Sequence, residues 1–553
     1  MASTAAARLV EALRAHGVDR VFCVPGESYL ALLDALHDAD DIDVVVTRHE
    51  SGAGFMALAD AKLTGRPGVA AVSRGPGATN ASIAVHLAEQ DAAPLVLLVG
   101  QVARHERGRG AFQEVDYGKT FSDMAKGVWE VHDAERLPEV VARAFHVAMS
   151  GTPGPVLIVL PEDMLEDACA ADVVPPLPVA AGGPSQEDVA RVAALLEKAE
   201  RPLIVAGGAL DSERGRAALA RAAAHHGIPV ALSFKRQDIF DNASPLYAGY
   251  LGFKIPKPLV ETLSQADLIL AIGTRLTDTA TQGYTLPTAP VPRQPLVHVY
   301  PDAGQIGRVF RTDVGLAADP AALLEALASL NATRAGDRTA WAEKTHAAAL
   351  GAAFAPRDLP RGVDFGRVVQ ALRARADRDA TIITDSGNFS SWVHKLWGWD
   401  GTTRAIGSVG GAMGLAMPGA VAAALRDPGR QALTFIGDGG ALMTGNELAT
   451  ACARNLPVKV FILNNGTYGT IRLHQEKAYP GRVVGTDLVN PDFAAWARAF
   501  GADGLTVAAP SDVEGVVAQA LAAKGPVVVD VRSDAELLSA FATVSGLRAA
   551  AGA

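Results

Sequence analysis

Short apolar runs alternate with amphipathic helical patterns along most of the chain. In the first third these runs cover 20–24, 42–47, 68–72, 94–100 and 155–161, and each has the length of a strand. Strand-length runs separated by helix-length segments are typical of a parallel sheet covered by helices on both faces. The same alternation recurs twice more. The pattern therefore predicts an α/β protein of three consecutive Rossmann-like domains with parallel sheets.

Changes in composition place the domain boundaries. A Pro- and Gly-rich stretch follows residue 172, and a helical pattern begins at Ser185. A polar, Ala-rich connector follows residue 330. We therefore predict an N-terminal domain over 1–172, a central domain over 185–330 and a C-terminal domain over 360–545, each of an ordinary domain size.

The composition excludes several classes of protein. Hydrophobic residues make up 49% of the 553 residues and charged residues 20%, which indicates large buried cores. The 50 Lys and Arg residues against 60 Asp and Glu give a net charge of −10 without a basic stretch, so nucleic acid is not an expected partner. No run approaches the roughly 18 apolar residues of a membrane span, so no membrane partner is expected either.

The first residues and the cysteines bear on the compartment. The Ala-rich start with Arg8 and Arg14 resembles a transit peptide, but it contains Glu11 and has apolar positions at helical spacing. We therefore expect it to be the first helix of a cytoplasmic protein. The three cysteines are far apart in apolar stretches, which favours buried thiols in a reducing compartment: Cys23, Cys169 and Cys452.

Glycine and oxygen-bearing side chains follow two predicted strands near the C-terminus. Gly437-Asp438-Gly439-Gly440 follows the strand 432–436, and Asn464-Asn465 follows the strand 458–463. Ligands of parallel sheets bind beyond the carboxyl ends of strands, and glycines let the backbone approach a phosphate closely. Carboxylate and amide oxygens suit Mg²⁺. The alternative is a glycine turn with a capping Asp and an unrelated loop Asn.

These two segments resemble the signature of the thiamine diphosphate enzymes. The resemblance implies that Mg²⁺ binds Asp438, Asn465 and the carbonyl of Thr467. It also implies a pyrimidine-binding N-terminal domain and a C-terminal domain that binds the diphosphate and the metal. The cofactor contacts that it implies are Pro25, Gly26, Asn80, Asn388, Met413, Gly437, Gly439, Gly440, Asn465 and Gly469.

The family also implies a catalytic glutamate in the N-terminal domain, and Glu50 fits it. This residue follows the strand 42–47 and precedes a helix of small residues. Thiamine catalysis needs loss of a very weakly acidic proton from the thiazolium C2, and a carboxyl beside the aminopyrimidine can protonate that ring so that its imino group acts as the base. Apolar surroundings favour such proton sharing. The alternative is that Glu50 only caps its helix.

Further motifs are closest to the acetolactate synthase branch of the family. They are the segments 24–27 (VPGE), 75–80 (GPGATN) and 111–114 (AFQE). By this resemblance Gln113 faces the active site as a catalytic residue, and Glu27 and Phe112 line the substrate pocket. The alternative for Gln113 is an ordinary surface glutamine. Met413 falls where the family has a bulky apolar residue under the cofactor, although a lone Met usually fills a core.

The chain departs from this branch at three positions near the expected substrate pocket. Thr279 stands where the family has an Arg that binds the second substrate's carboxylate, and threonine lacks that bidentate cationic fork. Thr470 and His474 stand where the family has Met and Trp. We therefore expect a different substrate pair. His474 is either a proton donor or acceptor-site contact, or a solvated histidine. Arg275 and Arg472 are candidates for anion recognition or surface residues.

The resemblance implies an enzyme that decarboxylates a 2-oxo acid and transfers the acyl carbanion to a carbonyl acceptor. One alternative is a non-ligating decarboxylase, because the segment 465–469 (NGTYG) also resembles the loop of benzoylformate-type decarboxylases. A 2-hydroxyacyl lyase and an inactive cofactor-binding paralogue are further alternatives.

The family places the cofactor between the N-terminal domain of one subunit and the C-terminal domain of another. A homodimer or homotetramer is therefore expected. Relatives often hold FAD in the central domain in a structural role, and Gly207-Gly208 and Gly273-Thr274-Arg275 are candidates for that site. Glycine pairs after strands are common in α/β domains, so FAD is left open.

Overall fold

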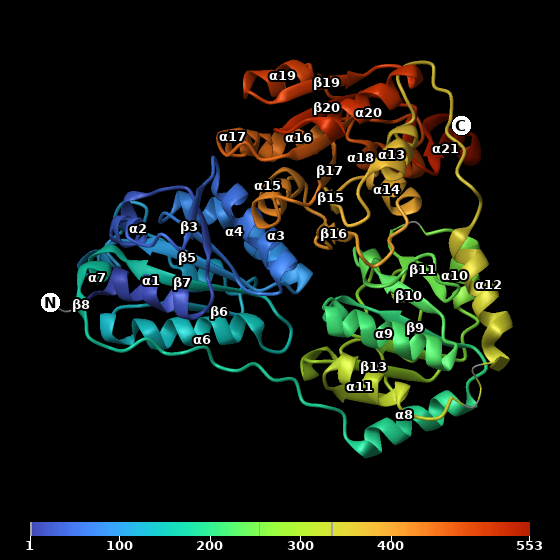
Figure 1. Cartoon of the computed structure of the whole chain (residues 1–553), viewed down its shortest axis with the longest axis horizontal. Coiled ribbons are helices and arrows are strands. Elements are labelled where there is room, and N and C mark those ends of the chain that lie inside the picture. The colour runs from blue at the N-terminus through green and yellow to red at the C-terminus, as the bar shows by residue number, and fades with distance from the viewer. Residues whose placement is uncertain (1–2, 254, 333, 335, 553) are drawn as a thin grey trace. The chain divides into compact units, whose positions relative to one another are not determined.

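The computed structural model describes residues 3–253, 255–332, 334 and 336–552 (Figure 1). It divides into two compact units. Unit 1 comprises Met1–Val179, Pro356–Trp397 and Ile406–Ala553, and unit 2 comprises Ala180–Ala355 and Gly398–Ala405. The chain forms three six-stranded parallel sheets flanked by helices, which confirms the predicted fold class. Within the described residues, no helix is both long and apolar enough to cross a membrane.

The N-terminal sheet has the strand order β3-β2-β4-β5-β7-β6. Its strands are β2 (Arg20–Cys23), β3 (Asp43–Val46), β4 (Gly68–Val72), β5 (Leu95–Gln101), β6 (Gly127–Glu130) and β7 (Pro155–Pro161). Its helices are α1 (Ala5–Ala15), α2 (Leu30–His37), α3 (Glu50–Thr64), α4 (Pro76–Asp91), α5 (Tyr117–Thr120), α6 (Leu137–Met149) and α7 (Glu162–Glu166). The short strands β1 (Ser3–Thr4) and β8 (Ala168–Cys169) pair antiparallel. The start of the chain forms helix α1, as its apolar spacing predicts.

The C-terminal sheet has the order β16-β15-β17-β18-β20-β19. Its strands are β15 (Thr381–Thr384), β16 (Arg404–Ile406), β17 (Ala432–Gly437), β18 (Val458–Asn464), β19 (Asp503–Val507) and β20 (Val527–Arg532), and β21 (Leu537–Ser539) and β22 (Ala542–Thr543) form a separate pair. Its helices are α13 (Phe365–Arg375), α14 (Ser390–Leu396), α15 (Ala416–Arg426), α16 (Asp438–Thr444), α17 (Leu448–Ala453), α18 (Gly469–Ala478), α19 (Phe493–Ala499), α20 (Val513–Ala522) and α21 (Val544–Ala551).

The N-terminal and C-terminal sheets share one topology. With the strands of each sheet renumbered in chain order, both sheets follow the order 2-1-3-4-6-5. Their second strands, β3 and β16, therefore lie at equivalent sheet edges. Their third strands, β4 and β17, lead into helices α4 and α16.

Unit 2 contains a sheet of the order β11-β10-β9-β12-β13-β14, which in chain order is 3-2-1-4-5-6, the order of dinucleotide-binding folds. Its strands are β9 (Pro202–Ala206), β10 (Val230–Ser233), β11 (Tyr247–Leu251), β12 (Leu268–Ile272), β13 (Leu296–Tyr300) and β14 (Val314–Ala317). Its helices are α8 (Gln186–Lys198), α9 (Glu213–His226), α10 (Lys257–Leu263), α11 (Pro320–Ala328) and α12 (Thr339–Leu350). A capping box between Ser185 and Asp188 begins α8, where the sequence predicts that helix.

One apolar core joins the two sheets of unit 1. Helix α3 packs against α4 and against α15 of the C-terminal sheet, and Figure 1 shows α3 beside α15. Residues 51–61 of α3 are buried on every side, which small residues make possible. A Cβ atom at Gly54 would collide with the Cβ of Ala84, so glycine lets α3 approach α4 closely. This core holds the first turn of α3, which begins at Glu50.

The cysteines are free thiols, as expected. Cys23 and Cys169 are buried, and burial raises the pKa of the Cys23 thiol to about 11. The prediction of a fully buried thiol is wrong for Cys452, which is half-buried because it lies near the end of the short helix α17.

Candidate functional site

Glu50 begins α3 and Asn80 lies near the start of α4, so the connections after β3 and β4 bring the two residues together. The Nδ2 of Asn80 donates to Glu50 Oε2 at 2.9 Å. The Cβ position of Gly77 lies 3.4 Å from Glu50 Oε1, a van der Waals distance, so the start of α4 packs against this carboxylate. The N-cap of α3 is His49, whose Nδ1 accepts from Ser51 N at 3.1 Å. His49 therefore provides the N-cap hydrogen bond of α3, while Glu50 lies in the first turn, where its charge also favours the helix N-terminus.

The other predicted residues of the N-terminal domain adjoin these two loops. A Cβ at Gly26, after β2, would lie 2.6 Å from the Cβ of Ser73, after β4. A Cβ at Gly75 would lie 2.8 Å from the carbonyl oxygen of Gln113. Gln113 has a φ of 64°, a left-handed conformation that is uncommon for residues other than glycine and that clusters at functional sites. These contacts place Pro25, Gly26, Asn80 and Gln113 around the end of the sheet that carries Glu50.

A carboxylate holds the loop before Gln113 in place. Glu114 accepts hydrogen bonds from the backbone N–H groups of Gly108 and Ala111 at 2.6 and 3.2 Å, and it pairs with Arg107 at 2.5 Å. This loop presents Phe112 with 74% of its surface exposed, an unusual state for a large apolar ring. The side chain of Glu27 is also mostly exposed, at 70%. Both predicted pocket residues are therefore accessible to a ligand.

In the C-terminal domain, Asp385 joins three strand-end loops. It is 1% exposed and follows β15. Its carboxylate accepts from Gly414 N at 2.9 Å, and a Cβ at Gly440 would lie 2.7 Å from its Oδ2. The loops after β15, β16 and β17 therefore meet at one carboxylate. Met413 precedes Gly414 and is half-buried, so it belongs to this cluster of loops.

A second set of contacts joins the loop of Asn388 to helix α18. The Asn388 N–H donates to Thr470 Oγ1 at 3.1 Å, and Asn388 Nδ2 donates to Gly469 O at 3.0 Å. His474 is exposed one turn further along α18. Arg472 pairs with the buried Glu476 at 3.0 Å, which favours the structural alternative for Arg472.

Asp438 lies at the end of β17 and is 3% exposed. Its Oδ1 accepts from Gly439 N at 2.9 Å, and its Oδ2 accepts from Gly466 N at 2.7 Å. Burial raises the pKa of this carboxyl, and a bound cation would favour its charged form. Asn465 and Thr467 lie in the loop that donates to Asp438. This set of hard oxygen donors fits Mg²⁺.

The predicted set of metal ligands contains one carboxylate, that of Asp438. In the part of the chain that the structure describes, no three His, Cys, Asp or Glu side chains gather into a metal site. A cation at this loop therefore relies on one carboxylate together with amide, carbonyl and phosphate oxygens. Such a partial set is typical of Mg²⁺ that binds together with a phosphate-bearing ligand.

Asn490 is a site residue that the sequence analysis missed. Its Nδ2 donates to Asp438 Oδ2 and to Asn464 Oδ1, both at 2.9 Å. Asn464 in turn donates to the buried Asp530 at 2.9 Å. Asn490 thereby orients the Asp438 carboxylate, although it is not one of the predicted metal ligands. It lies 52 positions after Asp438 in a loop, so no local motif marks it.

Replacement of Asn490 by Leu is expected to weaken Mg²⁺ binding by about 10- to 100-fold, as is typical for loss of a partner that orients a metal ligand. Titration calorimetry with Mg²⁺ in the presence of thiamine diphosphate measures the effect. Gln519→Ala on the exposed face of α20 is the control. Unchanged Mg²⁺ affinity in Asn490→Leu would contradict the orienting role.

The glycine loops of unit 2 lie at its topological switch point. Gly207-Gly208 follows β9 and Gly273-Thr274 follows β12, the adjacent strands at which the strand order reverses. A Cβ at Gly207 would collide with Thr274, and one at Gly208 would lie 2.8 Å from Arg236 Nε. These contacts show that the glycines let the two turns pack against Thr274 and Arg236, and Arg236 itself pairs with Asp211 at 3.1 Å.

Comparison with known proteins gives matches over most of the chain. The N-terminal TPP binding domain of thiamine pyrophosphate enzymes matches residues 3–120, their central domain matches 189–327, and their C-terminal TPP binding domain matches 385–531. The acetolactate synthase large subunit of Parasynechococcus marenigrum is 35% identical over 95% of this chain and 87% of its own length. The large subunit of acetolactate synthase isozyme 1 from Escherichia coli is 31% identical over 96% of this chain and 94% of its own.

Proposed function

The chain belongs to the acetolactate synthase branch of the thiamine diphosphate enzymes, and from this premise we propose that it decarboxylates a 2-oxo acid and transfers the acyl carbanion to a carbonyl acceptor. The observation that carries the proposal is the orientation of Glu50 by Asn80 at 2.9 Å in the pyrimidine-binding domain. A protein that only bound the diphosphate would need no oriented carboxylate in that domain.

The proposed cofactor site uses residues of both domains of unit 1. Asp438, Asn465 and the carbonyl of Thr467 would hold Mg²⁺. The backbone of Gly437, Gly439 and Gly440 would approach the diphosphate, and Asn388 and Gly469 would adjoin it. Pro25, Gly26 and Met413 would complete the cofactor contacts. Bound thiamine diphosphate supplies a thiazolium that stabilises the carbanion formed by decarboxylation.

Glu50 moves the proton that starts the reaction in this proposal. Its carboxyl would share a proton with the aminopyrimidine ring, while Asn80 keeps the carboxyl oriented. Gln113, held at its left-handed φ, would contact the substrate. Glu27, Phe112, Thr470 and His474 would line the pocket. Thr279 is neutral and cannot bind a carboxylate as the Arg of the family does. We therefore propose that the acceptor is not a second 2-oxo acid whose carboxylate binds at this position.

We also propose that the enzyme is a cytoplasmic homodimer or homotetramer. The contacts described for Glu50 come from the N-terminal domain, and those for Asp438 come from the C-terminal domain. Two such half-sites on different subunits would form a complete one. A monomer is therefore expected to be inactive, and light scattering with activity measured across a dilution series checks this. Full turnover by a proven monomer would contradict the proposal.

FAD is the further cofactor that unit 2 can accommodate. We place it at the switch point, where glycine turns follow β9 and β12 and where Arg236, which pairs with Asp211 at 3.1 Å, lies beside Gly208. Its role there would be structural. The visible absorption spectrum of the purified protein tests this placement: a flavin spectrum that Gly208→Leu abolishes supports it, and a colourless active enzyme contradicts it.

The proposed activity is tested with a panel of 2-oxo acids in the presence of thiamine diphosphate and Mg²⁺. Release of CO₂ together with a ligated product supports the carboligase. Release of CO₂ with only the aldehyde product supports the non-ligating decarboxylase, which the segment 465–469 favours. Cleavage of a 2-hydroxyacyl substrate identifies a lyase. Absence of turnover with bound cofactor would leave the inactive paralogue.

A further inference from the structure

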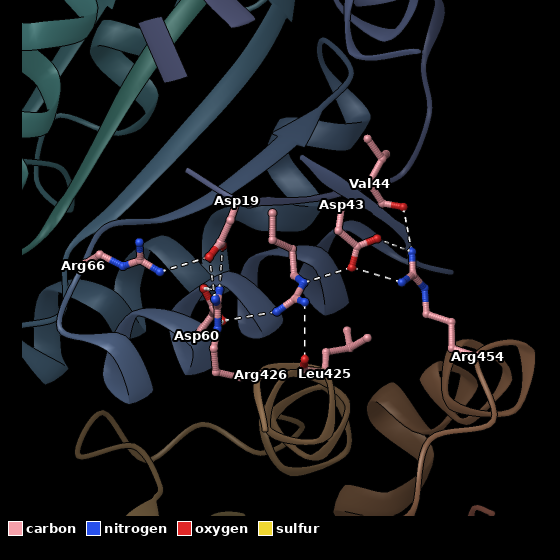
Figure 2. Close-up of polar contacts among 9 residues, drawn as sticks. Asp19, Asp43, Val44, Asp60, Arg66, Leu425, Arg426 and Arg454 are labelled. Atoms are coloured by element: carbon pink, nitrogen blue, oxygen red, sulfur yellow. Dashed lines mark hydrogen bonds and ion pairs between the residues drawn. The ribbon is translucent and has the colours of Figure 1, made fainter. Parts of the chain in front are cut away.

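The edge strand β3, which leads to Glu50, is docked on one face of the helical segment around α17. Arg454 donates to Asp43 and to Val44 O at 2.8 and 2.9 Å (Figure 2). The Thr450 hydroxyl oxygen lies 3.3 Å from Val46 O. Glu447 then accepts from the backbone of Arg48 and His49. Residues 447, 450 and 454 have the i, i+3, i+7 spacing of one helix face. This face of the helical segment therefore lies along the chain from Asp43 to His49.

Glu447 is the innermost of these contacts. Its carboxylate is 0% exposed, and its Oε1 accepts from Arg48 N at 3.0 Å and from His49 N at 3.1 Å. Its Oε2 accepts from the Thr450 hydroxyl at 2.9 Å. A Cβ at Gly52 would collide with Glu447, so the carboxylate lies directly against the first turn of α3. It contacts the backbone on both sides of Glu50 without contacting the Glu50 carboxylate.

The C-terminal domain receives an equivalent contact from the N-terminal domain. Asp91, at the end of α4, is 2% exposed and accepts from Val409 N at 2.7 Å and from Ser408 Oγ at 3.0 Å. Lys62 pairs with Asp91 at 2.6 Å. The residues Ser408 and Val409 follow the edge strand β16 and precede Met413. The two contacts are therefore equivalent. Glu447 lies in the connection after β17, the third strand of the C-terminal sheet, and its carboxylate contacts the loop after β3. Asp91 lies in the connection after β4, the third strand of the N-terminal sheet, and its carboxylate contacts the loop after β16.

We propose that Glu447 and Asp91 are reciprocal positioning residues: Glu447 fixes the segment that carries Glu50, and Asp91 fixes the segment that carries Met413. The roles of Glu50 and Met413 rest on the proposed function, whereas the two backbone contacts do not. A catalytic group must be held close to its working geometry, since a displacement of about 1 Å can cost about 10²-fold in rate. An edge strand has no sheet neighbour on its outer side to supply that restraint.

The side-chain chemistry predicts which replacements retain the function. Glu447 acts here as an acceptor for two backbone N–H groups; both donate to Oε1, at 3.0 and 3.1 Å, and Arg48 N also reaches Oε2 at a longer 3.3 Å. Glutamine keeps that oxygen, and the Thr450 hydroxyl can rotate to accept from the new amide. Leucine has a similar size but leaves two buried N–H groups without an acceptor, which is costly. Gln should therefore restore what Leu removes.

The test compares Glu447→Gln and Glu447→Leu as full-length enzyme loaded with thiamine diphosphate and Mg²⁺. Hydrogen exchange by mass spectrometry is expected to rise at least ~10-fold in peptides covering 46–50 for Leu and to stay near wild type for Gln. We expect kcat to fall by about 10²-fold for Leu, with KM and cofactor affinity nearly unchanged. Exchange of the cofactor's C2 proton should slow by the same factor as kcat.

Asp364→Leu is the matched control. Asp364 is another buried carboxylate of the C-terminal sheet, 1% exposed, and it accepts from Arg357 N and Gly366 N, both at 2.9 Å. Its loss should lower stability without changing exchange at 46–50. Asp91→Leu should raise exchange at 407–410 and leave 46–50 unchanged. If Glu447→Leu does not fold, the double variant Thr450→Val, Arg454→Gln tests the same helix face, with a smaller rise at 46–50.

Three results would overturn the proposal. The first is unchanged hydrogen exchange at 46–50 in Glu447→Leu, or in the double variant if Glu447→Leu does not fold. The second is an equal loss of kcat in Glu447→Gln and Glu447→Leu, which would point to the charge or proton of Glu447 rather than to its acceptor oxygen. The third is a matching rise at 46–50 in Asp364→Leu. If no 2-oxo acid turns over, the proposed function fails, but the exchange comparison still decides whether Glu447 positions this segment.

Discussion

Replacement of Glu50 by Gln is expected to lower kcat by about 10³-fold, within the range for loss of a proton-transferring side chain. Glutamine has the same shape as glutamate. Its amide oxygen can accept from Asn80 Nδ2 in place of Glu50 Oε2, which accepts that hydrogen bond at 2.9 Å. It cannot share a proton with the aminopyrimidine ring. Thiamine diphosphate affinity should therefore change little. Steady-state kinetics and titration calorimetry on the same preparation measure the two quantities.

Glu139→Gln is the control for this replacement. Glu139 lies in the first turn of α6 in the same domain and is exposed, so it matches Glu50 in helix position but not in surroundings. It should leave both quantities unchanged. Undiminished turnover in Glu50→Gln would remove the proton role from Glu50. A pure cofactor binder would show the same affinity in both variants and no activity to lose.

Asp438→Ala is expected to weaken Mg²⁺ binding by more than the roughly 10- to 100-fold typical of losing an outer partner, because Asp438 is the one carboxylate of the ligand set. Diphosphate binding should weaken with it, since a cation held by Asp438 would offset the negative charge of the diphosphate. Asp427→Ala, an exposed residue that pairs with Arg430 at 3.3 Å, is the control. Calorimetry with Mg²⁺ and cofactor checks the effect. Wild-type Mg²⁺ affinity would exclude the metal role.

In both the N-terminal and the C-terminal domain, the sequence predicts those candidate site residues whose pattern lies within one short segment. A strand that ends in Gly437-Asp438-Gly439 is visible in sequence because an apolar run, glycines and a carboxylate are adjacent. Glu50 was identified in the same way, but two roles remained open for it. The structure adds that the N-cap of α3 is His49 and that the Glu50 carboxylate contacts a residue 30 positions away, and the catalytic role stays a prediction.

The residues that sequence reasoning missed act over long separations. The contact of Asp385 with Gly414 spans 29 positions. Glu447 contacts Arg48 across 399 positions. Neither contact has a local pattern, because a buried carboxylate can accept from any backbone N–H group that the fold brings to it. The shared strand order of the first and third sheets was hidden for the same reason, since pairing is a long-range property.

The substrate pair depends on the same kind of long-range detail. Thr470 Oγ1 accepts from Asn388 N at 3.1 Å, so a residue at which this chain departs from the family's pattern adjoins a predicted cofactor contact. His474 is exposed one turn later on α18. Thr279 lies in unit 2. These three positions are where we expect a difference in acceptor specificity to originate.

The most direct test of the account is a steady-state assay with pyruvate, thiamine diphosphate and Mg²⁺, with and without FAD, that follows CO₂ and acetolactate together. The account predicts CO₂ release coupled to a ligated product, and acetolactate itself would show that Thr279 and His474 are tolerated changes. Turnover of a bulkier 2-oxo acid with ligation, but not of pyruvate, would assign those positions to a different substrate pair. Absence of any ligated product from every 2-oxo acid and acceptor would contradict the central claim.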